Sequence, residues 1–246
     1  MKYPTDFINK FIIGDSVAVM QKIPAGVIDL VITSPPYNLK NSTGNGMKDG
    51  RGGKWSNAAL INGYSHYDDN MPHKKYVGWQ RKNLEEMMRV LSKKGAIFYN
   101  HKWRVQNGLL QDRQDIISGF PLRQIIIWKR SGGINFNPGY FLPTYEVIYL
   151  IAKEGFELIP KSNAYGDVWE FNQDLKNAHP APFPLDLIDR IVSSTKANTI
   201  LDPFMGSGTT AMAAKMNRRN FVGIDISPQY CKMAKERLSK YQAKLI

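Results

Sequence analysis

The chain has 246 residues, of which 43% are hydrophobic and 22% are charged, and its only cysteine is Cys231. This composition is typical of a globular protein with one substantial core. It excludes an internal disulfide and a cysteine-rich zinc site, and no apolar run reaches the roughly 18–20 residues that span a bilayer. The formal net charge of +12 favours a polyanionic partner such as a nucleic acid.

Short apolar runs alternate with helical spacings along the chain. In chain order we predict a strand (11–13), a helix (16–23), a strand (27–33), a helix (76–91), three strands (96–100, 123–128, 145–153), a helix (184–194), a strand (199–201), a helix (209–216), a strand (221–224) and a final helix from Pro228. We expect Lys93, Lys94 and Gly95 to close the second helix. The alternation indicates an α/β fold, a doubly wound and mostly parallel sheet with helices on both faces.

Three stretches interrupt this pattern. Residues 40–75 are glycine-rich and poor in aliphatic side chains, while 129–141 and 160–178 are rich in glycine, proline, asparagine and aromatic residues. Long loops within a compact domain are usually functional or disordered. We therefore expect a single domain over 1–246 into which these three stretches are inserted.

A glycine-bearing turn follows the strand at 199–201. Gly206 and Gly208 allow a tight turn and a close approach to a ligand, and the free amides of the next helix point toward that turn. Asp225 ends the following strand, twenty-three residues after Asp202, where a carboxylate can accept both ribose hydroxyls of a nucleoside. A lone Gly-x-Gly turn is often only structural, but this complete arrangement favours a nucleoside cofactor.

Two consecutive prolines end the strand at 27–33. In Ser34-Pro35-Pro36-Tyr37 the prolines fix two φ angles and remove two backbone donors, so the strand must stop. The result is a stiff loop that carries an aromatic ring. An ordinary strand terminator and a loop built to hold a carbonyl and a ring in place both fit these residues.

Taken together, the loop Ser34-Pro35-Pro36-Tyr37 and the later stretch DPFMGSGTT resemble the S-adenosylmethionine-dependent DNA amino-methyltransferases. That family methylates adenine at N6 or cytosine at N4. The resemblance covers most of the chain, from Gly14-Asp15 through HPAPFP to GIDIS. It implies a circularly permuted, Rossmann-like methyltransferase fold of the beta class, because the target-base loop precedes the cofactor glycines.

The same resemblance implies S-adenosylmethionine as the cofactor, double-stranded DNA as the substrate and no metal. The Pro35 carbonyl and the Ser34 side chain would accept the hydrogens of the target amine, Pro36 would stiffen the loop, and Tyr37 would stack on the flipped base. Asp15 would contact the adenine of the cofactor, Asp225 its ribose and His179 its methionine end. The implied cofactor-binding residues are Asp15, His179, Asp202, Phe204, Gly206, Ser207, Gly208, Thr209 and Asp225.

Several alternatives remain open at this point. Within the family, a serine at position 34 is associated with cytosine N4, whereas aspartate or asparagine is commoner with adenine N6. Both groups accept a hydrogen bond, so the two bases are nearly even, with a slight preference for cytosine. An RNA or protein amine methyltransferase is disfavoured by the motif order. A non-catalytic DNA-binding module is disfavoured by the intact motifs.

The remaining expectations concern partners and location. The basic and aromatic residues of the 40–75 loop, with the insertions around 129–141 and 160–178, are candidates for DNA recognition. Family members often dimerise, and a cognate restriction endonuclease is a possible partner. Since the amino terminus lacks a signal-peptide pattern, we expect a cytoplasmic protein.

Overall fold

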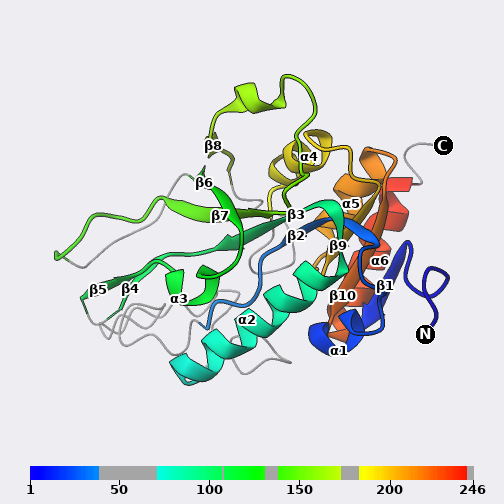
Figure 1. Cartoon of the computed structure of the whole chain (residues 1–246), viewed down its shortest axis with the longest axis horizontal. Helices are drawn as coiled ribbons and strands as arrows, with labels where there is room; N and C mark the ends of the chain where they lie inside the picture. The colour runs from blue at the N-terminus through cyan, green and yellow to red at the C-terminus, as the bar shows by residue number, and fades with distance from the viewer. Residues whose placement is uncertain (39–70, 107, 131–137, 173–182, 243–246) are drawn as a thin grey trace.

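The computed structural model describes residues 1–38, 71–106, 108–130, 138–172 and 183–242. Within them, an eight-stranded sheet has the order β1-β10-β9-β2-β3-β7-β6-β8 (Figure 1). Only β7 runs antiparallel to its neighbours on both sides in this part of the chain. The strands are β1 (Lys10–Ile13), β2 (Ile28–Thr33), β3 (Leu91–His101), β6 (Leu122–Lys129), β7 (Tyr145–Ala152), β8 (Val168–Glu170), β9 (Thr199–Asp202) and β10 (Asn220–Asp225).

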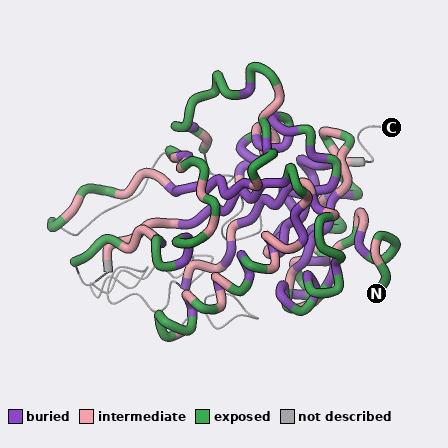
Figure 2. Tube along the Cα trace, in the orientation of Figure 1, coloured by how far each residue is buried: buried purple, intermediate pink, exposed green. Residues whose placement is uncertain are grey.

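Helices cover both faces of the sheet, which confirms the doubly wound fold (Figure 1). Leu30 and Ile32 of β2 face the core under α4, α5 and α6, whereas Val31 between them packs toward α1 and α2. The central strands are buried on both faces, as Figure 2 shows, which explains their continuous apolar runs. One face carries α1 (Ser16–Met20), α2 (His73–Val90) and α3 (Gln114–Ile117); the other carries α4 (Leu185–Ser193), α5 (Thr209–Met216) and α6 (Pro228–Gln242).

The winding direction of the chain changes between β9 and β2. From β9 the chain passes through α5 to β10 on one side, and from β2 it passes through α2 to β3 on the other. Ligands of open α/β sheets bind outside the carboxyl ends of the strands at such a switch point. Because β7 is antiparallel, its first residues lie at this same edge, where Val147 pairs with His101 of β3.

The junction of α2 and β3 corrects one prediction. The helix ends at Val90, and Leu91 already has an extended backbone with φ −66° and ψ 135°. Lys93, Lys94 and Gly95 therefore belong to β3 and not to a last helical turn. A Cβ on Gly95 would lie 2.7 Å from Leu91 Cδ2, so this glycine permits close packing within the sheet where the sequence pattern indicated a helix stop.

The structure contains small elements that the sequence pattern did not indicate. Strands β4 (Arg104–Gln106) and β5 (Leu109–Gln111) form a hairpin that the sequence analysis did not predict. Strand β8 lies within 160–178 and pairs with β6, so this part of the insertion extends the sheet. Residues 39–70, 131–137 and 173–182, which hold most of the predicted loop regions, lie outside the described residues.

No helix within the described ranges is long and apolar enough to cross a lipid bilayer.

Candidate active site at the carboxyl edge of the sheet

Asp202, at the end of β9, organises the glycine-bearing loop. Its Oδ1 accepts hydrogen bonds from the Thr33 hydroxyl (2.8 Å) and the Phe204 amide (3.1 Å), and its Oδ2 accepts one from the Thr210 hydroxyl (2.6 Å). Burial raises the pKa of this carboxyl to about 6, against the opposing effect of the three hydrogen bonds. The side chain is thus committed to shaping the loop.

Asp225, at the end of β10, holds the same loop from the other side. Its Oδ2 accepts the Gly206 amide at 2.9 Å, and its Oδ1 accepts the Ser227 amide at 2.8 Å. Gly206 and Gly208 have positive φ angles of 50° and 77°. A Cβ on Gly208 would lie only 2.8 Å from the Cβ of Ala234, so both backbone conformation and close packing require glycine there.

The other residues of this loop that were predicted to bind the cofactor, Phe204, Ser207 and Thr209, contact the neighbouring helices α2 and α6. Ser207 and Thr209 are buried, and Arg237 of α6 donates to Ser207 Oγ (3.2 Å) and to Thr209 Oγ1 (2.9 Å). Phe204 packs edge-on against Trp79 of α2, with 5.5 Å between ring centroids. Ser207 and Thr209 therefore hold the loop to α6, while Phe204 joins it to the helix on the opposite face.

Asp15 lies at the neighbouring strand end. It caps α1 by accepting the Ala18 amide at 2.9 Å, as a helix-capping residue does. The Gly14 amide donates to the Asp225 main-chain carbonyl at 3.0 Å, so β1 and β10 end side by side. The structure thus brings the predicted acids Asp15, Asp202 and Asp225 to one edge. His179 lies outside the described residues.

The Pro-Pro loop after β2 is held from below by α2. The Pro36 carbonyl lies 2.9 Å from the Tyr76 hydroxyl and accepts a hydrogen bond from Gln80 Nε2 at 3.1 Å. Among the described residues, no hydrogen bond reaches the Pro35 carbonyl. The helix therefore fixes the second proline and leaves the carbonyl of the first available.

His101, at the end of β3, supports Tyr37. The two rings are stacked with their centroids 4.7 Å apart, and His101 Nε2 lies 2.7 Å from the Tyr76 hydroxyl. Burial lowers the pKa of His101 to about 3, so the imidazole is neutral at physiological pH. Its Nδ1 lies 3.0 Å from the Lys102 carbonyl, which can only accept, so Nδ1 carries the proton.

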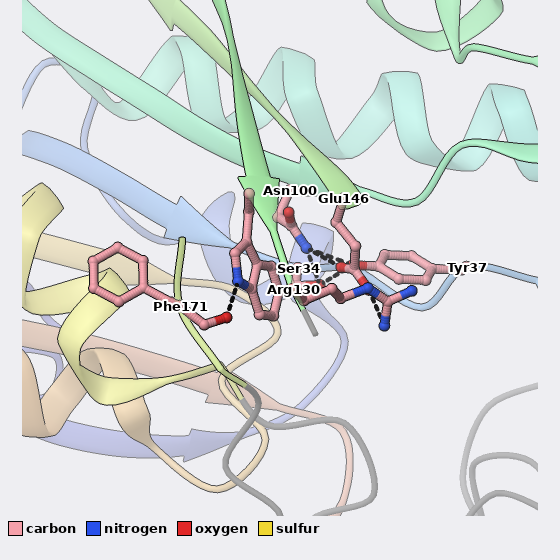
Figure 3. A network of polar contacts seen from close by, with 7 residues as sticks. Ser34, Tyr37, Asn100, Arg130, Glu146 and Phe171 are labelled. Atoms are coloured by element: carbon pink, nitrogen blue, oxygen red, sulfur yellow. Dashed lines mark hydrogen bonds and ion pairs between the residues drawn. The ribbon is translucent and has the colours of Figure 1, made fainter. Parts of the chain in front are cut away.

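Tyr37 also joins a polar network that the sequence analysis missed (Figure 3). Its hydroxyl lies 2.6 Å from Ser34 Oγ and donates to Glu146 Oε2 at 3.0 Å. Asn100 Nδ2 donates to the Tyr37 oxygen (2.6 Å) and to Glu146 Oε2 (2.8 Å), and Arg130 Nη1 lies 3.3 Å from Glu146 Oε1. A single acid in the apolar run YEVIYLIA was the available signal.

Asn38 closes the chain just beyond this loop. Its Nδ2 donates to the Met71 carbonyl (2.8 Å), and its Oδ1 accepts the Met71 amide (2.7 Å). Arg104 of β4 donates to the Asn38 carbonyl at 3.0 Å. Asn38 and Met71, which flank residues 39–70, are therefore joined to each other beside the Pro-Pro loop.

One hydrogen bond connects the two motifs. Thr33, which directly precedes Ser34, donates its hydroxyl to Asp202 at 2.8 Å across the switch point between β2 and β9. The stiff loop and the glycine-bearing loop, which are far apart in the sequence, thus start from neighbouring strands.

Known proteins resemble this chain over almost its whole length. A family model described as DNA methylase matches residues 28–236. The type II methyltransferase M.BglII of Bacillus subtilis is 31% identical over 96% of this chain and 71% of its own length. The DNA adenine methyltransferase YhdJ of Escherichia coli K12 is 28% identical over 96% of this chain and 85% of its own length.

Two solved structures share the fold. PvuII DNA methyltransferase, named as cytosine-N4-specific, superposes with a TM-score of 0.70 at 18% identity, covering 92% of this chain and 84% of its own. TTHA0409 of Thermus thermophilus, solved with S-adenosyl-L-methionine, gives a TM-score of 0.68 at 22% identity, covering 94% of this chain and 93% of its own. With the family match and the motif geometry, the conclusion is that this chain belongs to the DNA methylase family, the S-adenosylmethionine-dependent amino-methyltransferases of the cytosine-N4 and adenine-N6 kind.

Proposed function

We propose that the protein methylates the exocyclic amine of a base flipped out of double-stranded DNA, with cytosine N4 as the favoured target. The observation that carries this proposal is the Thr33–Asp202 hydrogen bond of 2.8 Å. It couples the strand that leads into Ser34 to the loop that carries Gly206 and Gly208. A methyl donor on one loop and an amine on the other would then meet at the switch point.

The residues at the ends of β1, β9 and β10 fit S-adenosylmethionine, which supplies an electrophilic methyl group when bound. Both oxygens of Asp225 accept main-chain amides, and a carboxylate oxygen can accept more than one hydrogen bond, so Asp225 is assigned to the ribose hydroxyls. Asp15 is exposed beside it, with Oδ1 engaged in the helix cap, and is assigned to the adenine. Asp202, Ser207 and Thr209 keep the loop in shape. His179 remains a prediction for the methionine end.

The Pro-Pro loop would prepare the amine. The lone pair of an aromatic exocyclic amine is delocalised into the ring, so acceptors for its two hydrogens favour the geometry in which that lone pair points at the methyl donor. The Pro35 carbonyl and Ser34 Oγ are assigned as these acceptors. Support comes from the contrast with the Pro36 carbonyl, which is occupied by α2.

Tyr37 is assigned to the flipped base. Its ring is held in place by stacking on His101, which would fix the orientation in which it stacks on a base. Base–aromatic stacking contributes roughly 1–3 kcal/mol, which offsets part of the cost of unstacking the base from the duplex.

The choice of cytosine rests on Ser34, since a neutral hydroxyl at this position is associated in the family with cytosine N4. The similarity to YhdJ, a DNA adenine methyltransferase, makes adenine N6 the competing assignment. A homodimer, a cognate restriction endonuclease and a cytoplasmic location remain predictions from the sequence.

The test is to incubate the protein with labelled S-adenosylmethionine and mixed-sequence duplex DNA, then to digest the DNA to nucleosides for mass spectrometry. We expect N4-methylcytosine. N6-methyladenine would correct the base while keeping the reaction. Label in parallel samples of RNA or protein, with none in DNA, would overturn the proposal.

A further inference from the structure

Glu146 is a buried acid at the edge of the sheet where the two loops meet, with only 7% of its surface exposed. It is the second residue of β7 and reaches this edge because that strand runs antiparallel. A buried carboxylate is costly unless it is paired and hydrogen-bonded. Here Arg130 lies 3.3 Å from Oε1, while Tyr37 and Asn100 donate to Oε2 (Figure 3).

The hydrogen-bond directions in this network follow from proton counting. An ionised carboxylate only accepts, so the single hydroxyl proton of Tyr37 points at Glu146. The Tyr37 oxygen can then only accept from Ser34, 2.6 Å away, and from Asn100, also 2.6 Å away. The proton of Ser34 is thereby directed inward. Asn100 Nδ2 lies 3.4 Å from Ser34 Oγ, so one of the two lone pairs of this oxygen faces Asn100 and the other can accept from a ligand.

We propose that Glu146 is a positioning residue and the final proton acceptor for methyl transfer, acting through Tyr37 and Ser34. As the amine nitrogen bonds the methyl carbon and the carbon–sulfur bond breaks, one amine proton passes to Ser34 Oγ. The Ser34 proton passes to the Tyr37 oxygen, and the Tyr37 proton passes to Glu146 Oε2. The positive charge of the sulfonium and the negative charge of Glu146 are thus both neutralised, because Glu146 ends as an uncharged glutamic acid. This inference rests on the proposed function.

The arrangement accounts for a serine at the head of the loop. A hydroxyl alone is a poor proton acceptor, whereas a carboxylate at that position would be a direct one. Here the carboxylate comes from β7 and acts across two hydrogen bonds, of 2.6 Å and 3.0 Å. Asn100 contributes no charge, but it donates to both Tyr37 and Glu146 and so fixes the positions of these two side chains relative to each other.

Among the described residues, the ionisable groups near Glu146 come from three parts of the chain. Arg130 follows β6, Lys102 follows β3, and Tyr37 belongs to the Pro-Pro loop. His101 lies behind Tyr37 and is neutral, because burial lowers its pKa to about 3.

The first variant is Glu146→Gln, which keeps the shape of the side chain and removes its charge. We expect kcat to fall about 100-fold or more, within the range for a positioned proton acceptor, with DNA KM and S-adenosylmethionine Kd within about twofold of wild type. Glu146→Asp should restore part of the loss. Glu154→Gln, just beyond the far end of the same strand, is the matched control and should leave kcat unchanged. A Glu146→Gln enzyme with kcat within about threefold of wild type would overturn the inference.

Tyr37→Phe gives an independent test, since it removes the linking hydroxyl and keeps the ring. The relay predicts a similar loss of kcat and no further loss in the Tyr37→Phe/Glu146→Gln double variant. Multiplicative losses would contradict it.

These outcomes separate the two proposals. A wild-type protein that methylates no DNA base would overturn the proposed function. A wild-type protein that methylates DNA, combined with a fully active Glu146→Gln variant, would overturn the relay alone. Thermal unfolding and cofactor titration of each variant establish that a lost activity reflects the chemistry and not the fold.

Discussion

The two halves of the proposed site, called the cofactor half and the target-base half after the roles proposed for them, are constructed differently. In the cofactor half, Asp202 and Asp225 are held by main-chain amides and threonine hydroxyls, nearly all from the stretch 202–227. In the target-base half, Ser34, Asn100 and Glu146 come from three strands or the loops that follow them, and meet through their side chains. A local turn can be specified by a short motif, whereas the network exists only once the sheet has formed.

Each half contains a buried group with a strongly shifted pKa, His101 in the target-base half and Asp202 in the cofactor half, and the two respond to pH in opposite directions. The pKa of His101 is lowered to about 3, so its contribution to stability is present above its ordinary pKa of 6.5 and is lost as pH falls toward 3. The pKa of Asp202 is raised to about 6, so its contribution is present below 3.8 and is lost as pH rises through 6.

The largest effect is expected from Asp202→Ala, which removes the central hydrogen-bond acceptor of the cofactor half. Removing the carboxylate leaves the Thr33 and Thr210 hydroxyls and the Phe204 amide without their acceptor, a loss of about 3 kcal/mol or more in the free energy of unfolding. Chemical denaturation measures it. Asp202→Asn keeps an acceptor and should cost clearly less; equal losses would mean that the hydrogen bonds are not the cause.

Gly208→Ala tests whether the loop depends on packing as well as on hydrogen bonds. Gly208 and Gly26 share a φ of 77°, but a Cβ on Gly208 meets Ala234 at 2.8 Å, while one on Gly26 meets nothing within 4 Å. We expect about 1 kcal/mol of destabilisation for Gly26→Ala from backbone strain and about 2–3 kcal/mol for Gly208→Ala. Indistinguishable melting temperatures would remove the packing argument.

His101→Gln addresses the target-base half. Between about pH 7.5 and pH 5, wild type should lose roughly 2 kcal/mol of stability through His101, because the unfolded chain takes up a proton that the buried ring does not. The variant should lack this loss. The opposite contribution of Asp202 is common to both proteins and cancels in the difference. Parallel stability curves over this range would show that the ring is not buried and neutral.

The smallest expected effect separates cofactor binding from the target loop. Asp225→Ala should weaken S-adenosylmethionine binding about tenfold, or roughly 1.4 kcal/mol, by loosening the Gly206 turn and removing an acceptor. Tyr37→Ala should leave that affinity within about twofold while lowering turnover. Calorimetric titration distinguishes them, and comparable losses of affinity would mean that the two halves are not independent.

The contrast between a local turn and a network of distant residues also explains which features could be predicted from the sequence. The stretch from β9 through α5 to β10 was predicted almost to the residue, because a strand, a glycine turn and a helix start are local signals. The helix α5 spans 209–216 both in the prediction and in the structure. The end of β2 at Thr33 was equally clear, because two consecutive prolines follow it. The basic Lys93-Lys94-Gly95 run misled the prediction, since its glycine serves packing within β3.

The sequence did not indicate which distant positions contact each other. Nothing in the local pattern indicates that Asn100 and Glu146 meet, because their contact depends on β7 running antiparallel beside β3. The β4–β5 hairpin and β8 were missed for a related reason: three-residue strands carry too little periodicity to distinguish them from loops.

The paired hydrogen bonds between Asn38 and Met71 have a consequence for how such enzymes diversify. They join the described residues on either side of 39–70, so the two flanking segments are held together beside the Pro-Pro loop. The entropic cost of joining two positions in a chain grows only logarithmically with the number of residues between them, by about 0.6 kcal/mol for each doubling. We expect this position to accept exchanged segments of very different length, so that new sequence preferences can evolve as modules while the chemistry beside them stays constant.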